Sequence, residues 1–150
     1  MSGDTSRPAP RVNGLPDLSA PSGGFLASSG LVFEEITPGL VRGHIDLGSD
    51  HHTPWGVVHG GVYTTAIESA ASVGASFAVA ENGQFAVGVN NSTDFLRAMR
   101  SGRVEVLATP IFQGRVQQLW QVLITRLDDG KEVARGQVRL QNVDLPASYK

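Results

Sequence analysis

Between Asp50 and Glu81 lie thirty residues in which Glu68 is the only Asp, Glu, Lys or Arg, and so long a neutral stretch limits the folds open to the chain. From Gly60 to about Glu81 this stretch is rich in alanine and contains no proline, and Asn82-Gly83 follows as a helix-ending signal. The pattern predicts one long helix. A helix without a charged face is a buried helix.

Runs with the character of β-strands flank this helix on both sides. Two precede it, at residues 31–36 and 40–47, joined by a Thr37-Pro38-Gly39 turn; four follow it, at residues 85–95, 104–113, 117–127 and 132–140. Mostly sequential, hairpin-connected strands around one helix predict an α+β fold. We expect a largely antiparallel sheet that curls around the central helix.

The length of 150 residues predicts a single domain. Residues 1–24 hold four of the eight prolines together with four glycines. Such a segment buries little apolar surface, so it is predicted to be flexible, with one folded domain over residues 25–150. Only 17% of the residues are charged. This low share suggests that part of the surface lies against another subunit.

Composition also excludes several kinds of function. The absence of cysteine rules out disulfides, a thiol nucleophile and a cysteine-based zinc site, and the four histidines lack metal-ligand spacing. Near-balanced charge, 14 Asp+Glu against 12 Lys+Arg, argues against a nucleic-acid partner. No apolar run reaches transmembrane length and no signal-peptide pattern is visible. We therefore expect a cytoplasmic protein with no membrane partner and no metal.

Glu68 is the first candidate functional residue. Burying an ionised carboxylate is costly unless it is paired, and perturbed carboxylates gather at functional sites. Thr64, Glu68, Ser72 and Ser76 recur every four residues and so share one helix face. This stripe could line a pocket. The alternative is a buried glutamate satisfied by its neighbours, with no chemistry.

The second candidate is the start of the helix, Trp55-Gly56-Val57-Val58-His59-Gly60-Gly61. The first turn of a helix presents unpaired N–H groups and a partial positive charge, and glycine allows close approach. The sequence therefore predicts a site for a polarised carbonyl oxygen, with a simple tight turn as the alternative. Gly60 and Glu68 are roughly 12 Å apart along one helix. A site that uses both needs two helices, and hence a homodimer.

Positive charge is the third candidate feature. Eight of the twelve Lys and Arg residues lie between Arg97 and Arg139. Arginine binds phosphate through forked hydrogen bonds, so this segment could recognise a phosphate-bearing ligand. The alternative is ordinary surface charge.

Taken together, these motifs resemble one family. The Gly56–Gly61 segment with an acid nine positions after His59, the run from Asn90 to Arg97, and Phe112-Gln113-Gly114-Arg115 resemble the hotdog-fold acyl-CoA thioesterases. Within them, the chain looks like the phenylacetate-pathway and 4-hydroxybenzoyl-CoA thioesterases, whose acid lies on the central helix. The resemblance covers about residues 25–142.

The resemblance implies roles for individual residues. Gly60 N–H would polarise the thioester carbonyl, and the partner subunit's Glu68 would attack it or activate water; Ser72 would help hold that water and His59 would shape the site. The substrate-binding candidates are Gly61, Thr53, Trp55, Asn90, Arg97 and Arg115. Coenzyme A would be part of the substrate, with no separate cofactor. The dimers are expected to pair into a homotetramer.

Some points stay open at this stage. Thr53 stands where the family has Gln, and Ala98 where it has Pro. Trp55 could line the acyl pocket or pack at the subunit interface. A hotdog hydratase or dehydratase using His59 and Glu68, or a non-catalytic acyl-CoA-binding module, are the alternative functions. The sequence does not identify the acyl group.

Overall fold

The computed structural model describes residues 11–12, 15–17 and 24–149. The predicted flexible segment, residues 1–24, therefore lies largely outside the described residues. In chain order the elements are β1 (Arg11–Val12), β2 (Leu15–Pro16), α1 (Phe25–Ser29), β3 (Val32–Thr37), β4 (Leu40–Leu47), α2 (Gly60–Val79), β5 (Gln84–Phe95), β6 (Gly102–Gln113), β7 (Gln117–Arg126) and β8 (Glu132–Asp144). Single turns of 3-10 helix lie at Ser49–His51, Ala80–Asn82 and Ala147–Tyr149.

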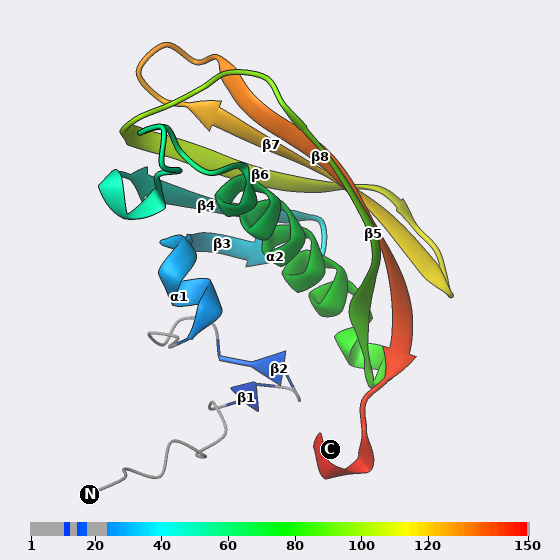
Figure 1. Cartoon of the computed structure of the whole chain (residues 1–150). Coiled ribbons are helices and arrows are strands. Elements are labelled where there is room, and N and C mark those ends of the chain that lie inside the picture. The colour runs from blue at the N-terminus through cyan, green and yellow to red at the C-terminus, as the bar shows by residue number, and fades with distance from the viewer. Residues whose placement is uncertain (1–10, 13–14, 18–23, 150) are drawn as a thin grey trace, which may run out of the picture.

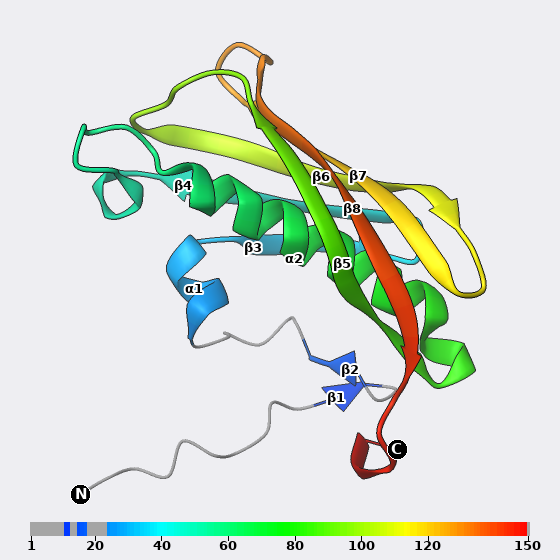
Figure 2. The ribbon, with the colours of Figure 1, turned by 45° about the vertical axis from the view of Figure 1, so that its right-hand side comes forward.

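Six of the strands form one antiparallel sheet in the order β3-β4-β6-β7-β8-β5. The sheet curves around α2, which lies across its concave face (Figures 1 and 2). The predicted α+β architecture, a curved antiparallel sheet around one central helix, is confirmed. β3 and β5 are the edge strands, which places β5 beside α2 with one side unpaired in this sheet.

α2 packs on the sheet through small residues. Its buried positions are Tyr63, Ala66, Ile67, Ala70, Ala71, Gly74, Ala75 and Val79. Trp120 of β7 is fully buried, and a Cβ atom added at Gly74 would lie 2.5 Å from its ring. The predicted burial of α2 is met on its sheet-facing side. A single sheet covers one side of a helix, and α1 contacts only part of the other, so the remaining positions are half-buried or exposed.

A buried polar network ties the C-terminal half of α2 to the sheet. Trp120 Nε1 donates to Gln118 Oε1 at 2.9 Å, and Gln118 Nε2 donates to Ala75 O at 3.0 Å and to Asn142 Oδ1 at 2.8 Å. Asn142 Nδ2 in turn donates to Gly114 O at 3.0 Å, in the β6–β7 turn. Because these groups satisfy one another, the polar side chains are buried without loss of hydrogen bonds.

None of the helices in the described part of the chain has the length and apolar character needed to cross a membrane.

Candidate active site

The N-terminus of α2 presents one free backbone donor. His59 is the N-cap residue, and its Nδ1 accepts the Gly61 N–H at 2.8 Å. Gly60 N–H has no hydrogen-bond partner within the described ranges. The Phe95 ring lies beside it, since a Cβ on Gly60 would be 3.0 Å from that ring. Of the two glycines, Gly60 is therefore the one whose N–H is open to a ligand, at the positive end of the helix dipole.

The loop before α2 is held by backbone hydrogen bonds. His59 N–H donates to His51 O and Val58 N–H donates to Met99 O, both at 2.8 Å. Thr53 N–H donates to Val57 O at 2.7 Å, while Thr53 Oγ1 accepts the Trp55 N–H at 3.3 Å. Thr53, predicted to bind substrate, thus builds the turn that leads into the helix. The Trp55 side chain is 82% exposed.

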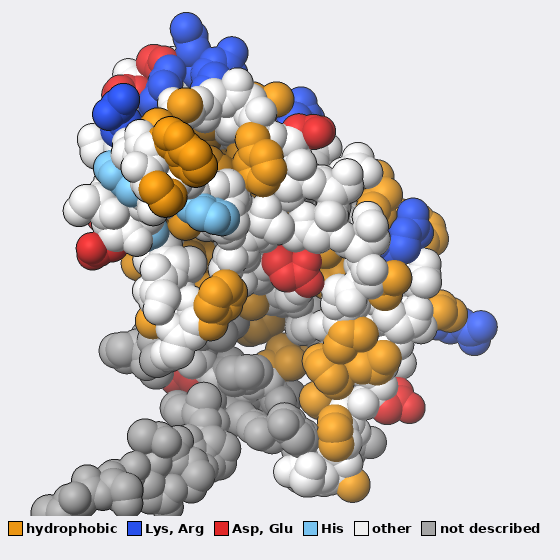
Figure 3. All heavy atoms as spheres, in the orientation of Figure 1, with side chains coloured by type: hydrophobic (Ala, Val, Ile, Leu, Met, Phe, Trp, Pro, Cys, Tyr) orange, Lys and Arg blue, Asp and Glu red, His pale blue; other side chains and the backbone are white. Residues whose placement is uncertain are grey.

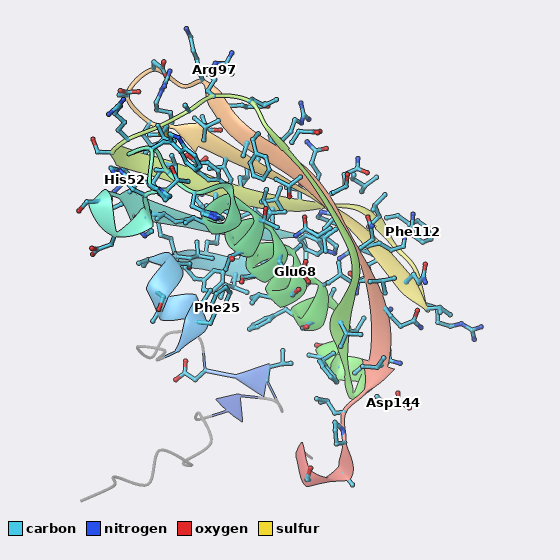
Figure 4. The ribbon with its side chains drawn as sticks, viewed as in Figure 1. Phe25, His52, Glu68, Arg97, Phe112 and Asp144 are labelled. Carbon is cyan, nitrogen blue, oxygen red and sulfur yellow. The ribbon has the colours of Figure 1, made fainter. Side chains whose placement is uncertain are left out.

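The Glu68 carboxylate is held from β5. Asn91 Nδ2 donates to Glu68 Oε2 at 3.1 Å and to Thr64 O at 3.3 Å. Asn91 Oδ1 accepts the Thr93 hydroxyl at 2.7 Å. The other carboxylate oxygen, Oε1, lies against Gly88, where an added Cβ would be only 2.1 Å away. Glu68 is half-buried on the middle of α2, beside β5 (Figure 4).

The predicted polar stripe of α2 faces β5. Thr64 contributes its backbone carbonyl to Asn91, and Ser76 Oγ accepts the Ala86 N–H at 3.0 Å. Ser72, between Glu68 and Ser76, makes no side-chain hydrogen bond to any residue that the structure describes. Glu68 is therefore paired with an amide on another element rather than with Thr64 or Ser72. A carboxylate held at a sheet edge remains reachable by a ligand.

A β-bulge explains why Asn91, and not the predicted Asn90, meets Glu68. Gly88 pairs with Leu140 and Asn90 pairs with Arg139, so Val89 is an extra residue in β5. Beyond the bulge the inward-facing positions are Asn91, Thr93 and Phe95, opposite buried positions of β8. Asn90 is exposed on the outer face, away from Glu68. An extra residue shifts the alternation of inward-facing and outward-facing side chains by one position. No sequence pattern predicted this shift.

The two predicted phosphate-binding arginines lie at opposite ends of the sheet. Arg97 follows β5 and lies near the start of β6, whereas Arg115 lies in the turn after β6. The twelve residues of β6 span roughly 40 Å at 3.4 Å per residue. Figure 4 labels Arg97 at one end of the molecule and Phe112 toward the other. One subunit therefore does not bring Arg97 and Arg115 to the same ligand.

Basic side chains gather at the end of the molecule where α2 begins (Figure 3). An open pocket of about 440 Å³ there is lined by Val57, Met99, Arg100, Arg126 and Asp128, among others. Arg126 forms ion pairs with Asp128 and Asp129, and its hydrogen bond holds the pKa of Asp129 well below the usual range. Arg97 and Arg100 form no ion pair with any carboxylate in the described ranges.

Tyr63 lies one turn into α2, 3% exposed, with its ring centroid 6.4 Å from that of Phe95. Its hydroxyl is buried without a hydrogen-bond partner in the described structure, and burial raises its pKa.

Three residues near the site were not predicted from the sequence: Tyr63, Gly88 and Asn91. Asn91 lay within a recognised motif, but only the bulge distinguishes it from Asn90. The described residues contain no cluster of His, Asp or Glu able to hold a metal ion.

A curved antiparallel sheet around one long helix, with an open N–H at the helix start, defines the hotdog fold of thioester-processing proteins. The model of the thioesterase superfamily matches residues 56–133, more than half of the chain, and the chain belongs to this superfamily. This confirms the resemblance inferred from the residues at the level of the superfamily.

Similar proteins include a Mycobacterium tuberculosis protein named "Putative esterase Rv1847". It is 47% identical over 122 residues, covering 80% of this chain and 86% of that protein. Its solved structure has a TM-score of 0.77 and covers 80% of this chain and 96% of that one. Thioesterase HI1161 of Haemophilus influenzae has a TM-score of 0.74 at 28% identity, covering 80% and 82%. "Proofreading thioesterase EntH" of Klebsiella pneumoniae is 27% identical over 67% of this chain and 72% of its own length. These similarities support a hydrolase that acts on thioesters.

Proposed function

We propose that the protein hydrolyses acyl-CoA thioesters to the free acid and coenzyme A. One observation carries the proposal: α2 offers an unpaired Gly60 N–H at its start and, on the face toward β5, a carboxylate held by Asn91. These are the two groups that thioester hydrolysis requires, a donor for the carbonyl oxygen and an activator of the attacking oxygen.

In the proposed reaction the substrate carbonyl oxygen accepts the Gly60 N–H. Negative charge develops on that oxygen in the transition state, and a helix N-terminus stabilises it; one such donor is worth about 10²–10³ in rate. Glu68 has two possible roles. It removes a proton from water, which attacks the carbonyl carbon, or it attacks that carbon itself and forms an anhydride that water then hydrolyses. In both routes the thiolate of coenzyme A leaves.

The proposed site is formed between two subunits. Gly60 and Glu68 of one α2 helix are roughly 12 Å apart, too far for one thioester to contact both. β5 is a twelve-residue edge strand, and Val89 and Phe95 on it are exposed. Long exposed edges invite pairing. We propose a symmetric homodimer in which Gly60 of each subunit faces the partner subunit's Glu68, with dimers pairing into a tetramer.

Further proposed roles follow from position. Arg97 and Arg100, which lack carboxylate partners in the described structure, lie on the Gly60 end beside the open pocket, where they would bind the phosphates of coenzyme A. Arg115 is at the opposite end and would contact only a coenzyme A held mainly by another subunit. Ser72, one turn beyond Glu68, would hold the attacking water, and exposed Trp55 would contact the acyl group or the second subunit.

The test is thiol release from a panel of acyl-CoA substrates by the parent protein and Glu68→Gln. We expect kcat to fall about 10²–10⁴-fold in the variant, because the carboxylate is lost and the shape is kept. Glu81→Gln, the same change at an exposed position just after α2, is the control. Near-parental turnover by Glu68→Gln would contradict the proposal. Single-turnover hydrolysis in ¹⁸O-labelled water tests the nucleophilic role, since label found in Glu68 establishes the anhydride route.

The two alternative functions have distinct signatures in the same assay. A hydratase or dehydratase would convert an enoyl thioester without releasing thiol. A non-catalytic module would bind acyl-CoA in calorimetry and leave it intact. Neither gains support from a specific contact, because His59 Nδ1 is occupied by the Gly61 N–H and His59 does not pair with Glu68.

A further inference from the structure

We propose that Gly88 and Asn91 of β5 are positioning residues that assign different tasks to the two oxygens of Glu68: Asn91 holds Oε2, and Oε1, in the space left by Gly88, is the oxygen that reacts. This inference rests on the proposed hydrolysis through Glu68. Beyond that function, it names the two residues that orient the Glu68 carboxylate and the carboxylate oxygen that reacts.

The Asn91 amide has one orientation that satisfies its contacts. Its Nδ2 donates to Glu68 Oε2 at 3.1 Å and to Thr64 O at 3.3 Å, while its Oδ1 accepts the Thr93 hydroxyl at 2.7 Å. A flipped amide would place its oxygen against the carbonyl of Thr64 and the carboxylate of Glu68, where it would find no donor. The network therefore supplies an N–H to Oε2 and fixes the Glu68 side chain from a neighbouring element.

Gly88 explains where Oε1 lies. A Cβ there would be 2.1 Å from Oε1 and 3.1 Å from Cδ of Glu68. The backbone does not require glycine, because Gly88 is not among the glycines with positive φ. Glycine inside a strand weakens it and often marks close approach of another group. The missing side chain thus provides the room that the carboxylate occupies.

Oε1 is also the less engaged oxygen. In the described structure it accepts no hydrogen bond, and Glu68 takes part in no ion pair. A lone pair on Oε1 is therefore free either to take a proton from water while that water bonds to the carbonyl carbon, or to bond to that carbon itself. In each case the C–S bond breaks and coenzyme A departs as the thiolate.

Gly88→Ala is the decisive variant. The atom that an added Cβ would displace is the far end of a flexible side chain, so the chain should fold with an unchanged melting temperature. We expect kcat to fall at least tenfold with little change in KM, because the carboxylate is pushed out of line while the substrate-binding surface is untouched. Ser92→Ala, an exposed position on the outer face of the same strand, is the matched control and should behave as the parent.

Asn91→Asp tests the other oxygen. It keeps the side-chain shape and removes the N–H donor. We expect kcat to fall at least tenfold with little change in KM, because Oε2 of Glu68 loses its donor and the carboxylate is no longer held in place. A role limited to folding would lower the melting temperature and leave the kcat of the folded variant near the parental value.

The outcomes separate this inference from the proposed function. If Gly88→Ala and Asn91→Asp keep parental kcat while Glu68→Gln is inactive, the positioning role is wrong and hydrolysis through Glu68 stands. If Glu68→Gln keeps its activity, the proposed function itself is wrong. If Gly88→Ala fails to fold, the kcat of folded Asn91→Asp decides.

Discussion

Tyr63 shows how strongly a single residue near the site is governed by burial. Its hydroxyl lies within the packing between α2 and the sheet and finds no hydrogen-bond partner in the described structure. A buried polar group without a partner costs about 1–3 kcal/mol. Because burial also disfavours the phenolate, the pKa of Tyr63 is raised above its ordinary value.

Tyr63→Phe is therefore expected to raise the free energy of unfolding by about 1 kcal/mol, since it removes the unsatisfied hydroxyl and keeps the ring. The gap from the parent should widen above pH 10. There the unfolded parent ionises at Tyr63 while the folded parent does not, so the parent loses stability as pH rises toward the raised pKa. Urea unfolding at several pH values measures both effects. A variant less stable than the parent at pH 7 would show that the hydroxyl has a partner.

Residue types, rather than contacts, could be read from the sequence. Glu68 was identifiable because it is the one charge in a long neutral stretch, and Gly60 because it opens a helix. Gly88 and Asn91 were not, because their relation to Glu68 depends on how β5 is registered against β8. A hydrogen bond between residues 23 positions apart is a property of the fold.

At the level of elements, long and periodic segments were predictable and short ones were not. α2 and β4 begin at the predicted residues, and β8 continues beyond the predicted end to Asp144. α1 is only five residues long, below the length at which a helical pattern stands out, so it was missed. The apolar character of α2 predicted a buried helix but did not say which of its faces the sheet covers.

Gly74 sets the distance between α2 and the sheet. Alanine normally stabilises a helix relative to glycine by about 1 kcal/mol. Here the added Cβ would lie 2.5 Å from the Trp120 ring, which is buried and cannot move aside. Gly74→Ala is expected to lower the free energy of unfolding by about 1–3 kcal/mol through overpacking.

Denaturant unfolding of Gly74→Ala tests this, with Gly39→Ala as the control. Gly39 lies in the β3–β4 turn with no atom within 4 Å of an added Cβ and without a positive φ, so alanine there should be neutral or slightly stabilising. Equal stability of both variants would mean that the Trp120 ring moves aside for the added Cβ. The distance between α2 and the sheet would then not be set by Gly74.

At the level of the whole molecule, the proposed site predicts complementation between inactive subunits. Gly60→Pro removes the N–H at the first helical position, where proline is favoured, and His59 already has φ −68° and ψ 131°, as a residue before proline does. The exposed Phe95 ring can move away from the added atoms. Gly60→Pro and Glu68→Gln should each be inactive alone.

Mixed subunits of the two variants should recover about a quarter of parental activity, because half of the dimers are mixed and each mixed dimer has one intact site. Thiol release after co-refolding measures this, and each variant refolded alone is the control. No recovery, with mixed dimers demonstrated by mass, would contradict a site shared between Gly60 of one subunit and Glu68 of the other.

Because Val89 is an extra residue in β5, its deletion would affect the strand differently from the deletion of any other residue there. A deletion inside a strand ordinarily turns every later side chain to the opposite face. β5 already holds one residue more than its partner between Gly88 and Asn90, so deleting Val89 would restore plain alternation and leave Gly88 and Asn91 facing α2. When sequences are aligned across this strand, a one-residue gap at position 89 therefore implies a straighter strand with the same inward-facing residues.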